Sequence, residues 1–297
     1  MFTGLSAFPL TPLTNDAVDE SSFAGLVERL AAVGVDSITT LGSTGSYAYL
    51  SAQERARVAR VAVEHAADTP VVVGIGALRT SQVLANLRSA QDAGAAGVLL
   101  APMTYQPLSA AEVLDLFTAV AEHAEVPVIV YDNPTTTRFT FTTDLYGRIA
   151  ALPGIASIKI PAVPADPCQA RARVDAIRAV IPDHVTIGVS GDAYAAAGLT
   201  AGADAWYSVL GGTLPEPALK ITRAAQTGDP TGASTQSKRL APLWSLFDEF
   251  GSLRVVAAIA EHLDLAPHGC LPLPVHGLRQ HHRDRVAAVL HELELTP

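Results

Sequence analysis

Lys159 is the residue whose type and surroundings point most clearly to chemistry. It lies in an apolar segment, residues 155–161, whose length and composition predict a buried β-strand. A charged ammonium group is costly to desolvate, so a buried lysine is held partly as the neutral amine, which attacks carbonyl carbons. The other two lysines, Lys220 and Lys238, fall in polar, helix-like segments. Taken alone, Lys159 could equally run its stem along the strand edge and reach water.

Two further segments carry groups that complement an amine. Ser43 and Thr44 lie between Gly42 and Gly45, and such a turn can direct backbone N–H groups and hydroxyls at a small anion such as a carboxylate. Tyr131 follows an apolar run and has a phenol that can pass protons. An amine, a proton shuttle and an anion-binding turn are the parts that Schiff-base chemistry on a 2-oxo acid requires. Separately, the turn and the tyrosine could be structural; together they favour a function.

These three segments need an architecture that brings them together. Short apolar runs alternate along the chain with helix-like stretches. This alternation predicts an α/β fold, a (β/α)8 TIM barrel, with a doubly wound open sheet as the alternative. In such barrels the active site forms at the carboxyl ends of the strands. The predicted strands are residues 5–8, 37–41, 71–75, 97–100, 128–131, 155–159, 185–189 and 205–209.

Helix boundaries can also be placed from the sequence. Ser51 with Glu54, and Ser109 with Glu112, have the spacing of capping boxes, and each pair predicts a helix start. Glycine follows three predicted helices, at positions 34, 94 and 202, where the chain turns toward the next strand. Beyond residue 229 the strand pattern stops. We therefore predict a catalytic barrel domain over residues 1–229 and a C-terminal helical extension over residues 230–297, with helices at 231–250, 252–265 and 275–295.

Composition and charge exclude several classes of function. The chain has 297 residues and a formal net charge of −9, which argues against a nucleic-acid groove. It has no apolar run of membrane-spanning length and no basic signal-peptide start, so we expect a cytoplasmic protein without a membrane partner. Cys168 and Cys270 are far apart and indicate neither a disulfide framework nor a zinc site. His281 and His282 adjoin charged residues and predict a solvated helix face rather than a metal site.

The segments described above resemble the dihydrodipicolinate synthase / N-acetylneuraminate lyase family, whose members are class I aldolases. The resemblance covers nearly the whole chain, and its specificity comes from the order and spacing of the motifs rather than from any one of them. The matching segments are residues 42–45, 50–51, 54–55, 74–77, 131–134, 157–159 and 190–192.

The resemblance implies a barrel with a C-terminal helical extension that assembles as a homotetramer or a dimer. It implies a lyase in which Lys159 forms a Schiff base with pyruvate or a related 2-oxo acid. The enzyme would make or break a C–C bond, or dehydrate its substrate, with neither a metal nor another cofactor. Tyr131 would be the proton shuttle, and Thr44 would orient Tyr131 through its hydroxyl. An aldehyde would be the second substrate.

The resemblance also implies residues that bind the substrates. The backbone amides of Ser43 and Thr44 would hold the carboxylate of the 2-oxo acid. Gly191 would contribute backbone contacts near the amine, and Tyr207 would line the pocket at the eighth strand.

The chain departs from the family pattern at positions that concern the second substrate. Synthases of the family carry a relay tyrosine one position before Tyr105, and an arginine at the position that Thr136 occupies here. We include Tyr105 and the nearest arginine, Arg138, among the candidate substrate-binding residues. Ser46 replaces an acidic residue after the turn, and Ile160 follows Lys159 where other branches have polar residues. The change after Lys159 predicts a drier and less anionic pocket around the amine.

Several alternatives stay open at this point. One is 4-hydroxy-tetrahydrodipicolinate synthase activity itself, which the changed loops argue against. Another is a non-catalytic barrel that binds a 2-oxo acid. A phosphate-binding barrel is suggested by Gly211 and Gly212 after the eighth strand. A dinucleotide site is less favoured, because Arg79 stands where the third glycine of that fingerprint belongs.

Overall fold

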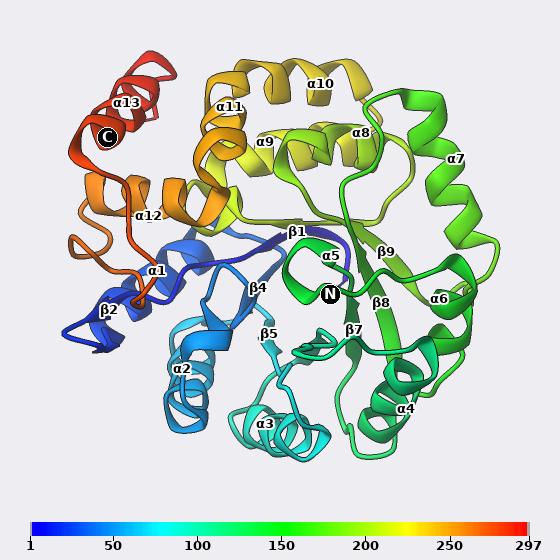
Figure 1. The fold of residues 1–297 in the computed structure, drawn as a ribbon. Helices are drawn as coiled ribbons and strands as arrows, with labels where there is room; N and C mark the ends of the chain where they lie inside the picture. The colour runs from blue at the N-terminus through cyan, green and yellow to red at the C-terminus, as the bar shows by residue number, and fades with distance from the viewer. Residues whose placement is uncertain (1, 296–297) are drawn as a thin grey trace.

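A closed barrel of parallel strands forms the centre of the computed structural model, which describes residues 2–295 (Figure 1). Successive strands pair with one another, and β1 pairs with both β4 and β10, so that the sheet has no free edge. Each barrel strand begins and ends within one residue of its predicted position, and the (β/α)8 prediction is confirmed. The strands are β1 (Gly4–Ala7), β4 (Ser37–Thr40), β5 (Val71–Gly74), β6 (Gly97–Leu100), β7 (Val128–Tyr131), β8 (Ile155–Ile160), β9 (Thr186–Val189) and β10 (Ala205–Ser208).

Helices surround the barrel, and their buried apolar residues belong to the same core as the strands (Figure 1). Both predicted capping boxes are present, at Ser51 and at Ser109. Gly34 ends its helix in the left-handed region, with φ of 78°, as predicted. The short helix α5 lies over the barrel opening in Figure 1. The helices are α1 (Glu20–Val33), α2 (Ala52–His65), α3 (Thr80–Asp92), α4 (Ala110–Ala121), α5 (Pro134–Thr137), α6 (Thr143–Ala150), α7 (Pro167–Arg178), α8 (Ala195–Thr200) and α9 (Pro215–Gln226).

The C-terminal part of the chain is helical, as expected, but two boundaries were wrong. The helix predicted over residues 231–250 is two helices, α10 (Pro230–Arg239) and α11 (Ala241–Phe250). Pro242 explains the break, because its ring would clash inside a continuous helix. The helix predicted from residue 275 begins only at Gln280, as α13 (Gln280–Glu292), whereas α12 (Ser252–His262) matches closely. The division at residue 229 into two domains stays a prediction.

A short antiparallel hairpin near the N-terminus was not predicted. It consists of β2 (Leu13–Thr14) and β3 (Ala17–Val18), joined by Asn15 and Asp16. Both joining residues have positive φ, 52° and 62°, which is the conformation of a type I′ turn. The Asn-Asp pair is the sequence signal for this turn, but strands of two residues have too little apolar pattern to be recognised.

The interior of the barrel near Lys159 is filled by one large side chain. The Tyr207 ring extends from β10 across Gly188 of β9, where a Cβ would come within 2.1 Å of it. The Tyr207 hydroxyl lies 2.7 Å from Ser157 Oγ of β8, two residues before Lys159. Phe8 packs edge-on against the same ring, with 6.0 Å between the ring centroids. Tyr207 therefore closes the barrel on the N-terminal side of Lys159, and Gly188 makes room for it.

We expect Gly188→Ala to lower the thermal stability of the protein, because the new methyl group overlaps the buried Tyr207 ring. Overpacking of this kind costs about 1–3 kcal/mol. The control is Gly25→Ala in α1, where a Cβ meets nothing within 4 Å and a helical alanine stabilises by roughly 0.5–1 kcal/mol. Thermal unfolding followed by circular dichroism should show opposite shifts for the two variants. A Gly188→Ala protein as stable as the wild type would contradict this packing.

Candidate active site

Lys159 lies inside the mouth of the barrel and is 4% exposed. It is the fifth residue of β8 and pairs in register with Tyr131 on β7 and with Gly188 on β9. Its Nζ atom lies 4.2 Å from the centroid of the Tyr131 ring and 5.6 Å from that of Phe8. The alternative in which the amine reaches bulk solvent at the strand edge is therefore wrong.

The surroundings of Lys159 favour the neutral amine. Burial lowers the pKa of Lys159, and the nearby Tyr131, Asp192 and Asp132 oppose this shift only in part. Among the described residues, 2–295, Lys159 takes part in none of the ion pairs, all of which join arginine or histidine to a carboxylate. A buried amine without a paired carboxylate can react as a nucleophile near neutral pH.

Tyr131 is the group closest to the amine and is held by two hydrogen bonds at its hydroxyl. Its oxygen lies 2.9 Å from Ser43 Oγ, and it accepts a hydrogen bond of 2.9 Å from Asn133 Nδ2. We expected the hydroxyl of Thr44 to orient Tyr131, and the structure corrects this: the contact comes from Ser43, while Thr44 is buried beside it. Sequence reasoning gave Asn133 no role.

The Ser43-Thr44 turn follows β4 and is tightly packed. Leu41, just before it, has a φ of 56°, and a Cβ on Gly45 would come within 2.9 Å of the Leu41 nitrogen. The turn thus brings Ser43, from the second strand of the barrel, to Tyr131, from the fifth. The predicted meeting of the turn, the phenol and the amine is present.

Arg55 supports the neighbouring strand end, and no role was predicted for it beyond its place in a family motif. The buried guanidinium donates hydrogen bonds of 2.9 Å to the carbonyl of Gly74 and 2.8 Å to that of Gly76. It also lies 5.4 Å from the centroid of the Tyr47 ring. These contacts fix the chain as it leaves β5.

Gly191 and Asp192 determine how β9 and β10 end. Gly191 has a φ of 80°, and a Cβ there would come within 2.8 Å of Ala162 Cβ. Asp192 accepts hydrogen bonds from Trp206 Nε1, from the Ser208 hydroxyl and from the Leu210 amide. The amide of Gly211 is bonded to Ser208 Oγ. Because these amides already have partners, the structure does not support the phosphate site considered at Gly211 and Gly212.

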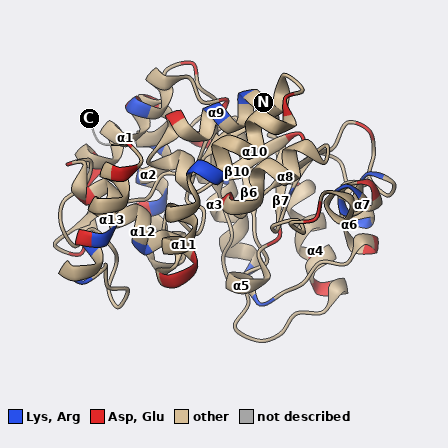
Figure 2. Ribbon diagram, turned by 90° about the horizontal axis from the view of Figure 1, so that it is seen from above, with Lys and Arg blue, Asp and Glu red and all other residues tan. Residues whose placement is uncertain are grey.

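Two predicted residues are exposed, and among residues 2–295 neither makes a side-chain hydrogen bond to Lys159, Tyr131 or Ser43. Tyr105 is 86% exposed in the loop between β6 and α4. Arg138 is exposed and forms the C-cap of α5, with φ of 56°. In Figure 2, α5 lies at the edge of the molecule, away from α8 and α10. Their part in substrate binding stays a prediction.

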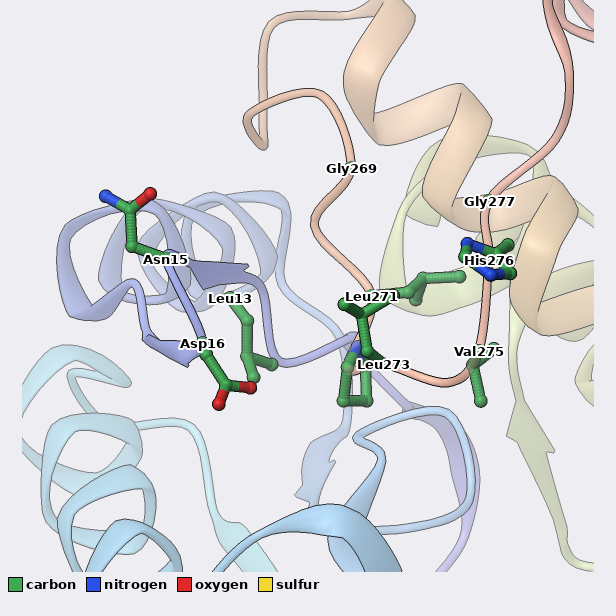
Figure 3. A pocket seen from close by; sticks show the side chains of 10 residues that line it. Leu13, Asn15, Asp16, Gly269, Leu271, Leu273, Val275, His276 and Gly277 are labelled. Carbon is green, nitrogen blue, oxygen red and sulfur yellow. The ribbon is translucent and has the colours of Figure 1, made fainter.

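Other features of the surface do not join this site. A cavity of about 280 Å³ lies between the β2–β3 hairpin and residues 269–277, with Leu13, Asp16, Leu273 and His276 in its wall (Figure 3). None of the predicted site residues lines it. Across residues 2–295, no cluster of three or more His, Cys, Asp or Glu side chains is arranged to hold a metal ion. No helix in the same range is long and apolar enough to cross a membrane.

Comparison with known proteins decides which family this site belongs to. The family model described as "Dihydrodipicolinate synthetase family" matches residues 1–293. The chain belongs to this family. A relative from Azoarcus sp. (strain BH72), named 4-hydroxy-tetrahydrodipicolinate synthase, is 31% identical over 298 residues, 98% of each chain. Another of the same name, from Hyphomonas neptunium, is 32% identical over 243 residues, 81% of each chain.

Solved structures agree with this assignment. The crystal structure of dihydrodipicolinate synthase from Agrobacterium tumefaciens has a TM-score of 0.94 to this chain and 43% sequence identity, covering 98% of both chains. The dihydrodipicolinate synthase of Acinetobacter baumannii, solved in complex with pyruvate, has a TM-score of 0.88 and 26% identity, covering 99% of both. The predictions of the family, of the fold and of a lyase of the class I, Schiff-base type are therefore confirmed.

We expect Lys159→Met to raise the melting temperature at neutral pH, because it removes a buried amine that is costly to charge. The pKa of Lys159 is lower in the folded than in the unfolded protein, so the unfolded chain binds more protons between those two values. The cost of Lys159 to the stability of the wild type is largest below the folded-state pKa of this lysine. It disappears as the pH rises past the unfolded-state pKa of about 10.4. Melting curves from pH 7 to pH 10.5 should show the advantage of the variant shrinking. An advantage that grows with pH would contradict the lowered pKa.

Proposed function

We propose that Lys159 forms an imine with pyruvate or a closely related 2-oxo acid, and that the enzyme makes or breaks a C–C bond next to that imine. The observation that carries this proposal is the buried amine at the barrel mouth, which lies 4.2 Å from the ring centroid of Tyr131 and forms no ion pair with a carboxylate of residues 2–295. Two neighbours in fold, from Acinetobacter baumannii and Escherichia coli K12, were solved with pyruvate, which supports this substrate class.

The chemistry follows from the amine and the phenol. The Lys159 nitrogen attacks C2 of the 2-oxo acid, and loss of water from the carbinolamine leaves a protonated imine. Loss of a proton from C3 moves its electron pair into a C2–C3 double bond and neutralises the iminium nitrogen. The resulting enamine adds to an aldehyde carbon, and the reverse sequence cleaves the product. Tyr131, hydrogen-bonded to Ser43, would carry the protons in these steps.

The remaining roles are part of the same proposal. The amides of Ser43 and Thr44 would hold the substrate carboxylate, and Gly191 and Tyr207 would shape the pocket around it. Tyr207 supports this by its position, because its ring closes the barrel beside Lys159. The reaction would proceed without a metal or another cofactor, since the iminium itself accepts the electron pair.

The outer part of the site concerns the second substrate and the assembly. Tyr105 and Arg138 are exposed in one chain and would act only where the aldehyde or a neighbouring subunit meets the barrel mouth. A homotetramer or a dimer would supply such a neighbour. The cytoplasm is the compartment we propose for the enzyme, and the two free cysteines agree with it.

A second candidate is 4-hydroxy-tetrahydrodipicolinate synthase activity itself, which the names of the curated relatives favour. Against it stands Thr136, an exposed hydroxyl where the resemblance leads us to expect an arginine for a second carboxylate. Turnover measured with pyruvate and a panel of aldehydes, with and without a carboxylate, separates the two. A strong preference for carboxylated aldehydes would favour the synthase.

We expect incubation with pyruvate and borohydride to add the reduced pyruvate unit irreversibly to Lys159. Intact-mass measurement and peptide mapping detect this adduct, and Lys159→Arg is the control, because a guanidinium stays charged and cannot form the imine. The absence of an adduct at Lys159 with several 2-oxo acids would overturn the proposed function. An adduct without turnover on any aldehyde would indicate the non-catalytic binding barrel instead.

We expect Tyr131→Phe to keep the fold and the trapped adduct but to lose turnover by about 10²- to 10⁴-fold, the usual contribution of a positioned proton donor. The ring that lies beside Lys159 is retained in this variant, so the loss reports the hydroxyl alone. Steady-state kinetics with the best aldehyde from the panel measures it. A variant within threefold of the wild type would remove Tyr131 from the mechanism.

A further inference from the structure

We propose that Asn133 is a positioning residue that holds the Tyr131 hydroxyl as a hydrogen-bond acceptor and so sets the direction in which this phenol passes its proton. The inference rests on the proposed function and adds a residue to it. Its basis is the 2.9 Å hydrogen bond from Asn133 Nδ2 to the Tyr131 oxygen.

The local backbone explains why Asn133 is available for this contact. It is the N-cap of α5, a position where an asparagine side chain usually accepts a hydrogen bond from the first turn of the helix. Here the side chain makes no such bond, and the backbone carbonyl of Asn133 accepts from the Thr137 amide at 2.9 Å and from the Thr137 hydroxyl at 2.9 Å. Pro134 disfavours helical backbone at Asn133, and Asn133 has φ of −147° and ψ of 81°. The backbone is thus fixed while the amide is directed at Tyr131.

The two hydrogen-bond partners of the Tyr131 hydroxyl, Asn133 and Ser43, then differ in what they can do. An amide N–H group can only donate, so the phenol oxygen uses a lone pair to accept it. The phenol hydrogen remains for Ser43 Oγ, 2.9 Å away, or for a group of the substrate. When that proton leaves, the amide still donates to the oxygen that carries the charge. Asn133 therefore directs the phenol hydrogen of Tyr131 away from the amide and toward Ser43 or the substrate.

The position of Tyr105 distinguishes the hydrogen bonding of Tyr131 in this protein from the family pattern. Tyr105, which stands one position after the place where the family carries its relay tyrosine, is 86% exposed and makes no hydrogen bond to Tyr131 among the described residues. Within one chain, Asn133 fills the second hydrogen-bonding place on Tyr131. It lies two residues after Tyr131, just beyond the end of β7, and its side chain reaches the Tyr131 hydroxyl.

The experiment separates imine formation from proton transfer at C3 of pyruvate. The first readout is the fraction of protein trapped by borohydride at saturating pyruvate. The second is the rate at which solvent deuterium enters the pyruvate methyl group, followed by proton NMR. Asn133→Ala removes the amide group, and Asn133→Asp keeps the shape of the side chain but, as a carboxylate at neutral pH, can only accept hydrogen bonds. Asn86→Ala is the matched control, because the Asn86 side chain donates a comparable hydrogen bond to the carbonyl of Ile75, the residue that follows β5.

We expect both Asn133 variants to be trapped as fully as the wild type but to exchange deuterium about tenfold more slowly, the effect of losing one hydrogen bond to a charged oxygen. Asn86→Ala should match the wild type in both readouts. Exchange in Asn133→Asp at or above the wild-type rate would overturn the inference, because shape alone would then suffice. So would a wild type that is trapped but exchanges no deuterium. A wild type that is not trapped at all would instead overturn the proposed function.

Discussion

The desolvation of one ammonium group is the constraint on which the site depends. Lys159 lies on a strand of a closed barrel that pairs with a neighbour on each side, and its side chain is almost completely buried. The protein does not neutralise this charge with an adjacent carboxylate. The two nearby acids, Asp132 and Asp192, are instead held by their own donors: Asp132 by the Tyr146 hydroxyl, and Asp192 by Trp206, Ser208 and Leu210. Their charges reduce the lowering of the Lys159 pKa but do not pair with the amine.

The space around the amine is created by small residues and closed by large ones. Gly188 leaves room for the Tyr207 ring, and Gly42 lies where a Cβ would come within 2.8 Å of the Phe8 ring. The aromatic side chains fill the barrel interior and leave the amine at its mouth. Reactivity and packing are therefore linked, because the residues that exclude water from Lys159 are the same ones that stabilise the barrel core.

Much of this could be predicted from local sequence. Apolar runs located the strands, since a strand buried on both faces needs continuous apolar residues, and the serine-glutamate pairs located two helix starts. What could not be predicted depends on side-chain direction. Ser43 and Thr44 are adjacent hydroxyls, and the sequence does not indicate which of them meets Tyr131, whereas the structure shows the contact from Ser43. Asn133 stands two residues after Tyr131, and this short separation makes a contact between them predictable. Arg55 contacts carbonyl groups about twenty residues along the chain, and the sequence does not indicate such partners.

The hydrogen bond from Trp206 to Asp192 has one more consequence. The chain has two tryptophans, and Trp244 lies in the helical part, bonded to the Ser237 carbonyl. Trp206 is fully buried, and its indole nitrogen donates to a carboxylate whose charge is felt at Lys159. The indole of Trp206 is therefore linked to the lysine nitrogen through the charge of Asp192, and its intrinsic fluorescence offers a way to follow changes of charge at the amine.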